Sequence, residues 1–169
     1  LHLHAGQHIS INLAPADLTS GKLPPLLSHL MNKWKVHPQQ IALELTERGF
    51  ADPAVSVPAI AAFRRAGHAI YIDDFGTGYS SLSYLQDLDV DTLKIDKSFV
   101  DALEYKNVTP HIIEMAKSLK LAMVAEGIET EGQIEWLHRH GVQYGQGWYF
   151  SKALPKEDFI LWAAHNLRK

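Results

Sequence analysis

Residues 69–85 read AIYIDDFGTGYSSLSYL, an apolar run followed by two adjacent aspartates and a glycine-rich turn. The first four residues have the length and composition of a buried strand. Asp73 and Asp74 come next, and neighbouring carboxylates repel each other unless a positive charge lies close by. Gly76 and Gly78 permit a turn that brings Asp74 back towards Asp73. The stretch therefore predicts a strand that ends in a charged site.

Short apolar runs like this one recur along the chain and alternate with segments of helical pattern. One such segment begins with Asp52 and Pro53, an N-cap followed by a proline in the first turn, and Gly67 marks its end. Another begins with the capping-box pattern of Thr130 and Gln133. Strands that alternate with helices predict a parallel sheet with crossover connections. The predicted strands are residues 9–13, 41–45, 69–72, 92–95 and 121–125, with a weaker candidate at 142–144.

Five of these strands share one arrangement of side chains. Apolar residues occupy one face, which suits packing under helices, and a polar group lies on the other face near the carboxyl end. A doubly wound sheet would bury both faces and have a single switch point, whereas a (β/α) barrel gathers its site from many strand ends. The pattern predicts an α/β fold, a TIM-like (β/α) barrel that is incomplete, with about six of eight strand–helix units. A simpler alternative is that strand ends are polar because they meet solvent.

The composition is that of one soluble globular domain. The chain has 169 residues, with 46% hydrophobic and 21% charged residues. A net charge of −3 indicates no surface for DNA or RNA. The absence of cysteine excludes disulfides and thiolate metal sites, and fits a cytoplasmic location. No apolar run approaches the roughly 18 residues that span a bilayer, so we expect no direct membrane contact from this segment.

The predicted barrel brings several carboxylates to one mouth. They need a counter-charge, because like charges raise one another's pKa, and Lys94 alone is too little. A bound divalent cation meets this need, and an all-oxygen ligand set selects Mg²⁺ or Mn²⁺, with Ca²⁺ left open. Two adjacent aspartates suit a two-metal site of the kind that cleaves phosphate esters. The converging oxygen ligands are Asn12, Glu44, Asp73, Asp74 and Glu126.

Five segments, in order along nearly the whole chain, resemble the motifs of EAL-domain cyclic-di-GMP phosphodiesterases. They are ALELTE, DDFGTGYSSLSYL, LKIDKSFV, VAEGIET and GQGWYFSKAL. The resemblance implies a (β/α) barrel that binds two Mg²⁺ or Mn²⁺ ions. It also implies hydrolysis of cyclic di-GMP to the linear dinucleotide pGpG, in bacterial signalling and biofilm regulation.

The resemblance also implies roles for single residues. Lys94 would contact the attacking water or the scissile phosphate, and Gln146 would position water or substrate. Together with Glu126 they are the predicted catalytic residues. Glu47 and Glu129 would hold the DFGTGYSS loop in place. The implied metal ligands are Asn12, Glu44, Asp73, Asp74 and Glu126.

Further expectations concern the whole protein. The Glu-Ala-Leu motif that names the family is absent, so we expect residues 1–169 to be a partial EAL domain that lacks the N-terminal strands. Sensor or signalling domains would precede it in the parent protein, which could anchor it to a membrane. A homodimer would form through the loop and helix from Phe75 to Leu85.

Two other functions fit the same residues. The first is a non-catalytic receptor or regulatory domain that binds cyclic di-GMP without turnover. The second is a Schiff-base aldolase with Lys94 as nucleophile. The surrounding carboxylates argue against the aldolase, because they should raise the pKa of the lysine and keep it protonated. Trp148 and Tyr149 follow Gln146 closely and either touch a guanine base or pack in the core.

Overall fold

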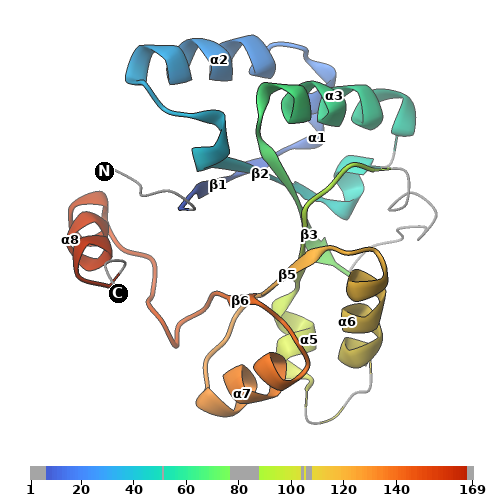
Figure 1. Ribbon diagram of the computed structural model, residues 1–169, viewed down its shortest axis with the longest axis vertical. Coiled ribbons are helices and arrows are strands. Elements are labelled where there is room, and N and C mark those ends of the chain that lie inside the picture. Colours follow the sequence, from blue (N-terminus) through green and yellow to red (C-terminus); the bar gives the residue numbers. More distant parts are fainter. Residues whose placement is uncertain (1–6, 51, 77–87, 104, 106–107, 167–169) are drawn as a thin grey trace.

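The computed structural model describes residues 7–50, 52–76, 88–103, 105 and 108–166. Within these residues, six strands form one parallel sheet whose spatial order follows the sequence. The sheet curls, with helices along its outer side (Figure 1). Because the strand order never reverses, the fold has no topological switch point, and the predicted incomplete TIM-like barrel is confirmed. The strands are β1 (Ile9–Leu13), β2 (Ile41–Thr46), β3 (Ala69–Phe75), β4 (Thr92–Ile95), β5 (Ala122–Ala125) and β6 (Tyr144–Gly145).

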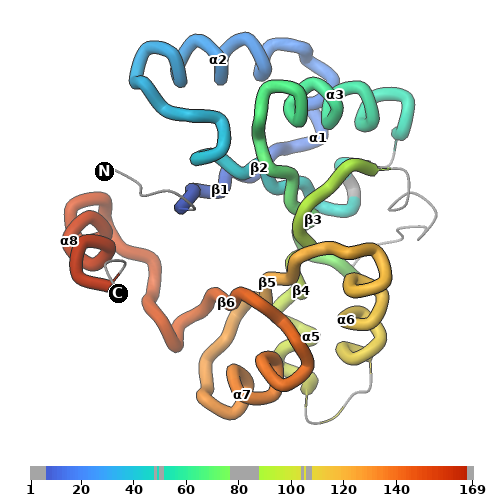
Figure 2. The backbone as a smooth tube through the Cα atoms, viewed as in Figure 1, coloured from blue at the N-terminus to red at the C-terminus, as the bar shows by residue number. Residues whose placement is uncertain are grey.

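The helices fall into two groups and one outlier. Figure 1 shows α2 and α3 along one flank of the sheet, and α5, α6 and α7 along the other. Figure 2 shows α8 apart from α7, at the end of the long segment that leaves β6. The helices are α1 (Pro15–Thr19), α2 (Leu23–Trp34), α3 (Pro53–Ala66), α5 (Lys97–Asp101), α6 (Val108–Ser118), α7 (Glu131–Arg139) and α8 (Lys156–Asn166), with short 3₁₀ turns at η1 (Pro38–Gln40) and η2 (Glu47–Phe50). No helix in the described part of the chain is long and apolar enough to cross a bilayer.

The helix ends follow the chemistry that the sequence predicted. The Asp52 side chain accepts a hydrogen bond from Ala54 N at the start of α3, and Gly67 ends that helix with a left-handed φ of 98°. Thr130 and Gln133 form the expected capping box of α7. These caps fix where α3 and α7 begin, in the connections that follow β2 and β5.

The core lies between the outer face of the sheet and the helices. Alternate residues of β2 to β5 are fully buried there, against side chains such as Phe63 of α3 and Ile113 of α6. Strand β1 departs from the prediction. Ile9 and Ile11 are 43% and 37% exposed. Within the described residues β1 is an edge strand, paired with β2 alone, so these two side chains lack the cover that was expected.

Strand β3 is longer than predicted, and it is irregular. It continues to Phe75, so Asp73 and Asp74 lie inside the strand and not beyond it. Ile72 pairs with Leu93 and Phe75 pairs with Ile95, so β3 holds one residue more than β4 between the two pairs. This bulge coincides with a left-handed φ of 53° at Asp74.

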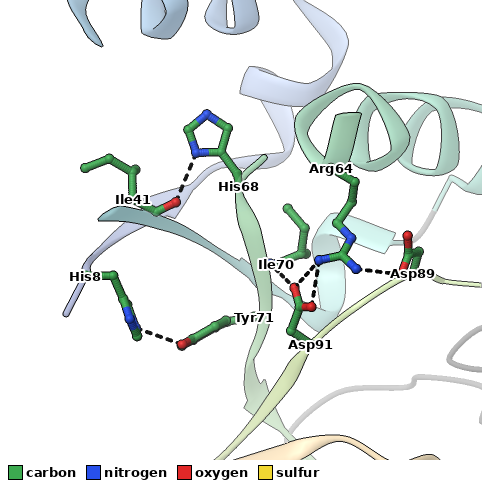
Figure 3. A network of polar contacts seen from close by, with 8 residues as sticks. All are labelled: His8, Ile41, Arg64, His68, Ile70, Tyr71, Asp89 and Asp91. Carbon is green, nitrogen blue, oxygen red and sulfur yellow. Dashed lines mark hydrogen bonds and ion pairs between the residues drawn. The ribbon is translucent and has the colours of Figure 1, made fainter. Parts of the chain in front are cut away.

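A polar network ties the amino-terminal ends of the central strands together (Figure 3). Arg64 of α3 donates from Nη1 to both carboxylate oxygens of Asp91 at 2.6 Å, and from Nη2 to Asp89 at 2.9 Å. Asp91 also accepts a hydrogen bond from Ile70 N at 2.8 Å. The network joins α3, β3 and the residues that lead into β4, and it braces the end of the sheet opposite the predicted site.

Candidate functional site

The polar side chains of the strands meet at the carboxyl end of the sheet, as the sequence predicted. The register places Asn12 of β1 beside Glu44 of β2, and Thr46 beside Asp73 of β3. Glu126 follows directly after β5, and its N–H donates to the carbonyl of Ile95 at 3.0 Å. Parallel pairing thus aligns the ends of five strands that are far apart in the sequence.

Lys94 of β4 occupies the centre of this cluster. Its Nζ lies 2.7 Å from Glu44 Oε2, 2.8 Å from Asp73 Oδ1 and 2.6 Å from Glu126 Oε1. The side chain is buried, with the residue 4% exposed. Burial by itself lowers the pKa of Lys94, but the hydrogen bonds that its ammonium group donates to Asp73, Glu126 and Glu44 outweigh this effect and raise the pKa. The lysine is therefore a fixed cation, which agrees with the argument against a Schiff-base nucleophile.

A second group of oxygens lies beside the lysine. One carboxylate oxygen from each of Asp73, Asp74 and Glu126 lies within 4.8 Å of the other two. Burial raises the pKa of Asp74, with the charge of Asp73 adding to the effect. Burial also raises the pKa of Glu126, against the opposing influence of Lys94. The single positive charge of Lys94 is not enough to neutralise these carboxylates. Their oxygens suit a hard divalent cation, which would supply the missing positive charge.

Asn12 completes the oxygen-rich side of the cluster. With its amide nitrogen turned inward, it donates to Asp73 Oδ2 and Glu44 Oε2, both at 3.2 Å. Turned the other way, the same side chain presents its carbonyl oxygen to the carboxylates, an orientation that a bound cation would favour. The structure therefore brings together all five residues that were predicted as metal ligands.

Gln146 reaches the site from the segment that follows β6. Its Nε2 donates to Glu126 Oε1, the same oxygen that Lys94 contacts. The backbone is held on both sides, because Gln146 N donates to the carbonyl of Ala125 at 2.9 Å and Ile128 N donates to that of Gln146 at 3.0 Å. The predicted association of Gln146 with the charged cluster is thus present in the geometry.

The two predicted loop-holding glutamates lie in different surroundings. Glu47 is buried, and its Oε1 accepts from Gly76 N at 2.8 Å, where the chain leaves β3. Its Oε2 has no hydrogen-bond partner within the described residues. Glu129 is exposed and pairs with Lys97 Nζ at 3.0 Å. Any contact of either glutamate with residues 77–87 lies outside the described residues.

The predicted dimer segment also falls mostly outside the described residues. It was expected to run from Phe75 to Leu85, and residues 77–85 are not described. Phe75 belongs to β3 and is buried in the core. Its side chain is therefore engaged within the subunit.

A large cavity adjoins Gln146. Its volume is about 1040 Å³, and aromatic side chains from the segment after β6 and from α8 line it, among them Trp148, Tyr149, Phe159 and Trp162. Trp148 and Tyr149 are exposed, so the alternative of core packing is wrong for both within the described structure.

Fold and site together define a barrel-type α/β protein with an under-neutralised carboxylate cluster at the carboxyl ends of its strands. The family model for the EAL domain matches residues 1–153, and the chain belongs to that family.

The relatives agree with this assignment. The chain is 72% identical over 167 residues to the "Probable cyclic di-GMP phosphodiesterase PdeB" of Escherichia coli. The match covers 99% of this chain and 32% of PdeB. The chain thus spans about a third of the length of this curated relative.

Solved structures show the same fold. The PaMucR phosphodiesterase in complex with c-di-GMP matches 92% of this chain and 65% of its own, with a TM-score of 0.87 and 34% identity. The Klebsiella pneumoniae BlrP1 complex with manganese and cyclic di-GMP matches 88% of this chain and 39% of its own, with a TM-score of 0.76 and 30% identity.

Proposed function

We propose that this chain is the site-bearing part of a phosphodiesterase that hydrolyses cyclic di-GMP to pGpG with the help of divalent cations. One observation carries the proposal: the carboxylates of Asp73, Asp74 and Glu126 cluster beside Lys94 at the carboxyl end of an EAL fold. The likeness to the probable cyclic di-GMP phosphodiesterase PdeB supports it, as do the cyclic di-GMP complexes of PaMucR and of BlrP1, the latter with manganese.

Two Mg²⁺ or Mn²⁺ ions would be held by the oxygens of Asn12, Glu44, Asp73, Asp74 and Glu126. Bound there, divalent cations supply a nucleophilic water at neutral pH and neutralise charge on the phosphate. Phosphate esters cleaved in this way need no covalent enzyme nucleophile. Hence the catalytic task of the chain itself is to orient groups and to supply charge.

Lys94 and Gln146 would perform that task. Lys94 is a buried point charge, and it would contact the attacking water or a phosphate oxygen. Gln146 already donates to Glu126, so it would orient that carboxylate and present its remaining amide hydrogen to water or substrate. Glu47 would position the start of the loop after β3 through its contact with Gly76 N. Glu129, in the segment after β5, would help to hold the same loop.

The surroundings of the site lead to further proposals. Within the described residues, β1 and β6 each have one paired side, and a closed barrel would cover both free edges with further strand–helix units. We assign residues 1–169 to a partial EAL domain on this ground. A homodimer through the segment from Phe75 to Leu85, sensor or signalling domains upstream, and a cytoplasmic location without nucleic-acid or membrane contact complete the proposal.

The test is turnover of cyclic di-GMP followed by chromatography, in Mn²⁺ and in EDTA. It is run on this chain and on this chain preceded by the adjoining segment of the Escherichia coli relative. We expect conversion to pGpG in Mn²⁺ and none in EDTA, at least for the longer protein. If both proteins bind cyclic di-GMP without turnover, the proposed enzymatic activity is wrong and the domain is a receptor.

A matched pair of variants locates the activity. Asp74→Asn removes a charge from the cluster and should abolish turnover. Asp89→Asn removes a charge from the opposite end of the sheet, where the side chain pairs with Arg64, and should leave turnover unchanged. Equal effects of the two substitutions would contradict the proposed site.

A further inference from the structure

Lys97 stands close to the site in the chain, although the proposed chemistry does not use it. It is the first residue of α5 and follows Lys94 by three positions. Asp96 caps this helix, since its Oδ1 accepts from Ser98 N at 3.0 Å. The cap fixes the direction in which α5 leaves β4, and so fixes where the side chain of Lys97 begins.

The methylene chain of Lys97 packs against Gly127. A Cβ atom built on Gly127 would lie 2.3 Å from Lys97 Cγ, 2.6 Å from Cδ and 2.7 Å from Cβ. Gly127 also has a left-handed φ of 67°. The lysine stem thus occupies the space that a side chain at 127 would need, and it contacts the backbone of the residue directly after Glu126.

The ammonium group of Lys97 extends the same contact. Its Nζ lies 3.0 Å from Glu129 Oε1 and 2.8 Å from Asp101 Oδ1. One end of this bridge is in α5 and the other is in the segment after β5. Lys97 therefore spans residues 127–129 on one side, while the backbone of Gln146 holds Ile128 on the other.

We propose that Lys97 is a positioning residue that holds the segment from Gly127 to Glu129, and through it the carboxylate of Glu126, in the geometry that binds the cation. This inference rests on the proposed function of the site. It also gives Glu129 a partner within the described residues, through which it acts on the segment next to Glu126.

The stem and the charge of Lys97 contribute unequally. The Lys97 side chain is 45% exposed and that of Glu129 is 42% exposed, so solvent screens their ion pair. The contact between the stem and Gly127 does not depend on salt. Removal of the stem should therefore matter more than removal of the charge.

The test is calorimetric titration of Mn²⁺ alone into this chain and its variants. We expect Lys97→Ala to raise the Kd for Mn²⁺ about tenfold, the lower end of the range for groups that orient metal ligands. Lys97→Met keeps a stem of similar length without the charge, and should stay within about threefold of the parent, because it retains the contact with Gly127. Comparison of the methionine and alanine variants therefore separates the effect of the stem packing on Gly127 from the effect of the positive charge.

Lys117→Ala is the matched control. Lys117 pairs with Glu114 on α6, and its side chain is 44% exposed, nearly the value of Lys97. It should leave the affinity for Mn²⁺ unchanged. Parent-like affinity in Lys97→Ala, or an equal loss in Lys117→Ala, overturns the role of Lys97 alone. If only the longer protein of the turnover assay binds Mn²⁺, the same variants are titrated in that protein. Absence of Mn²⁺ binding by both proteins overturns the proposed metal site, and the role of Lys97 with it.

Discussion

The two ends of the sheet each hold a basic side chain among carboxylates, yet their charges balance differently. At the amino-terminal end, Nη1 of Arg64 donates to both carboxylate oxygens of Asp91, and Nη2 donates to Asp89. At the carboxyl end, Lys94 meets three carboxylates at once, and Asp74 lies beside them.

The geometry of the two cations explains the difference. The guanidinium of Arg64 is a planar fork, and backbone N–H of Ile70 also donates to Asp91, so that carboxylate has its charge and its hydrogen bonds matched. The ammonium of Lys94 is a compact point charge, and its one positive charge cannot neutralise all the carboxylates around it. One network is suited to hold the sheet together, and the other is suited to receive a further cation. The following substitutions test this contrast.

Substitution of Lys94 by methionine should have the largest effect. It leaves Glu44, Asp73 and Glu126 as buried carboxylates without their shared cation. We expect the free energy of unfolding in EDTA to fall by about 3 kcal/mol, the range found when one partner of a buried pair is removed. Urea unfolding at neutral pH measures the loss. A loss below about 1 kcal/mol, typical of an exposed pair, would show that Lys94 is not essential to the charge balance.

Addition of Mn²⁺ should stabilise the chain almost as strongly. A ligand that binds only the folded state adds about 2.7 kcal/mol at roughly one hundred times its Kd. Asp74→Asn should remove most of this gain, because the substitution takes a charge from the oxygens that lie within 4.8 Å of one another. Thermal unfolding with and without Mn²⁺ provides the measurement. The same gain in Asp74→Asn as in the parent would place the cation elsewhere.

Substitution of Asp91 by alanine should affect stability without affecting metal binding. Arg64 Nη1 and Ile70 N both lose their acceptor, while Arg64 Nη2 keeps Asp89, and we expect a fall of about 2 kcal/mol in the free energy of unfolding. The affinity for Mn²⁺, measured by calorimetry, should match that of the parent. A change in that affinity would mean that the two ends of the sheet are coupled.

Substitution of Asp89 by alanine should have the smallest effect. Its side chain is 71% exposed, and it makes a single ion pair with Arg64 at 2.9 Å. Screening by solvent limits such a pair to about 0.5 kcal/mol. Urea unfolding of the variant beside Asp91→Ala tests this ranking, which the opposite order of effects would refute.

Much of this contrast could be predicted from the sequence, because it follows from local patterns. The alternation of side chains along each strand was enough to place Glu44, Asp73 and Lys94 on one face. The caps at Asp52 and Thr130 were visible as short motifs. Both kinds of pattern depend on neighbours in the chain, so they survive without knowledge of the fold.

Other features depend on contacts between distant residues and were not predictable. The exposure of Ile9 and Ile11 depends on what lies beside an edge strand. The packing of Lys97 on Gly127 joins residues that are far apart in the sequence. The bulge in β3 arises where its pairing with β4 shifts, and no single residue type predicts such a shift.

That bulge bears on how such a site could be built or transferred. In a regular strand two consecutive side chains point to opposite faces, so an Asp-Asp pair alone cannot bring both carboxylates to one mouth. Here the extra residue in β3 and the left-handed φ at Asp74 turn both towards Glu126. An engineer who grafts this pair into another barrel must therefore graft the backbone irregularity with it, and β-branched residues would be poor replacements at position 74.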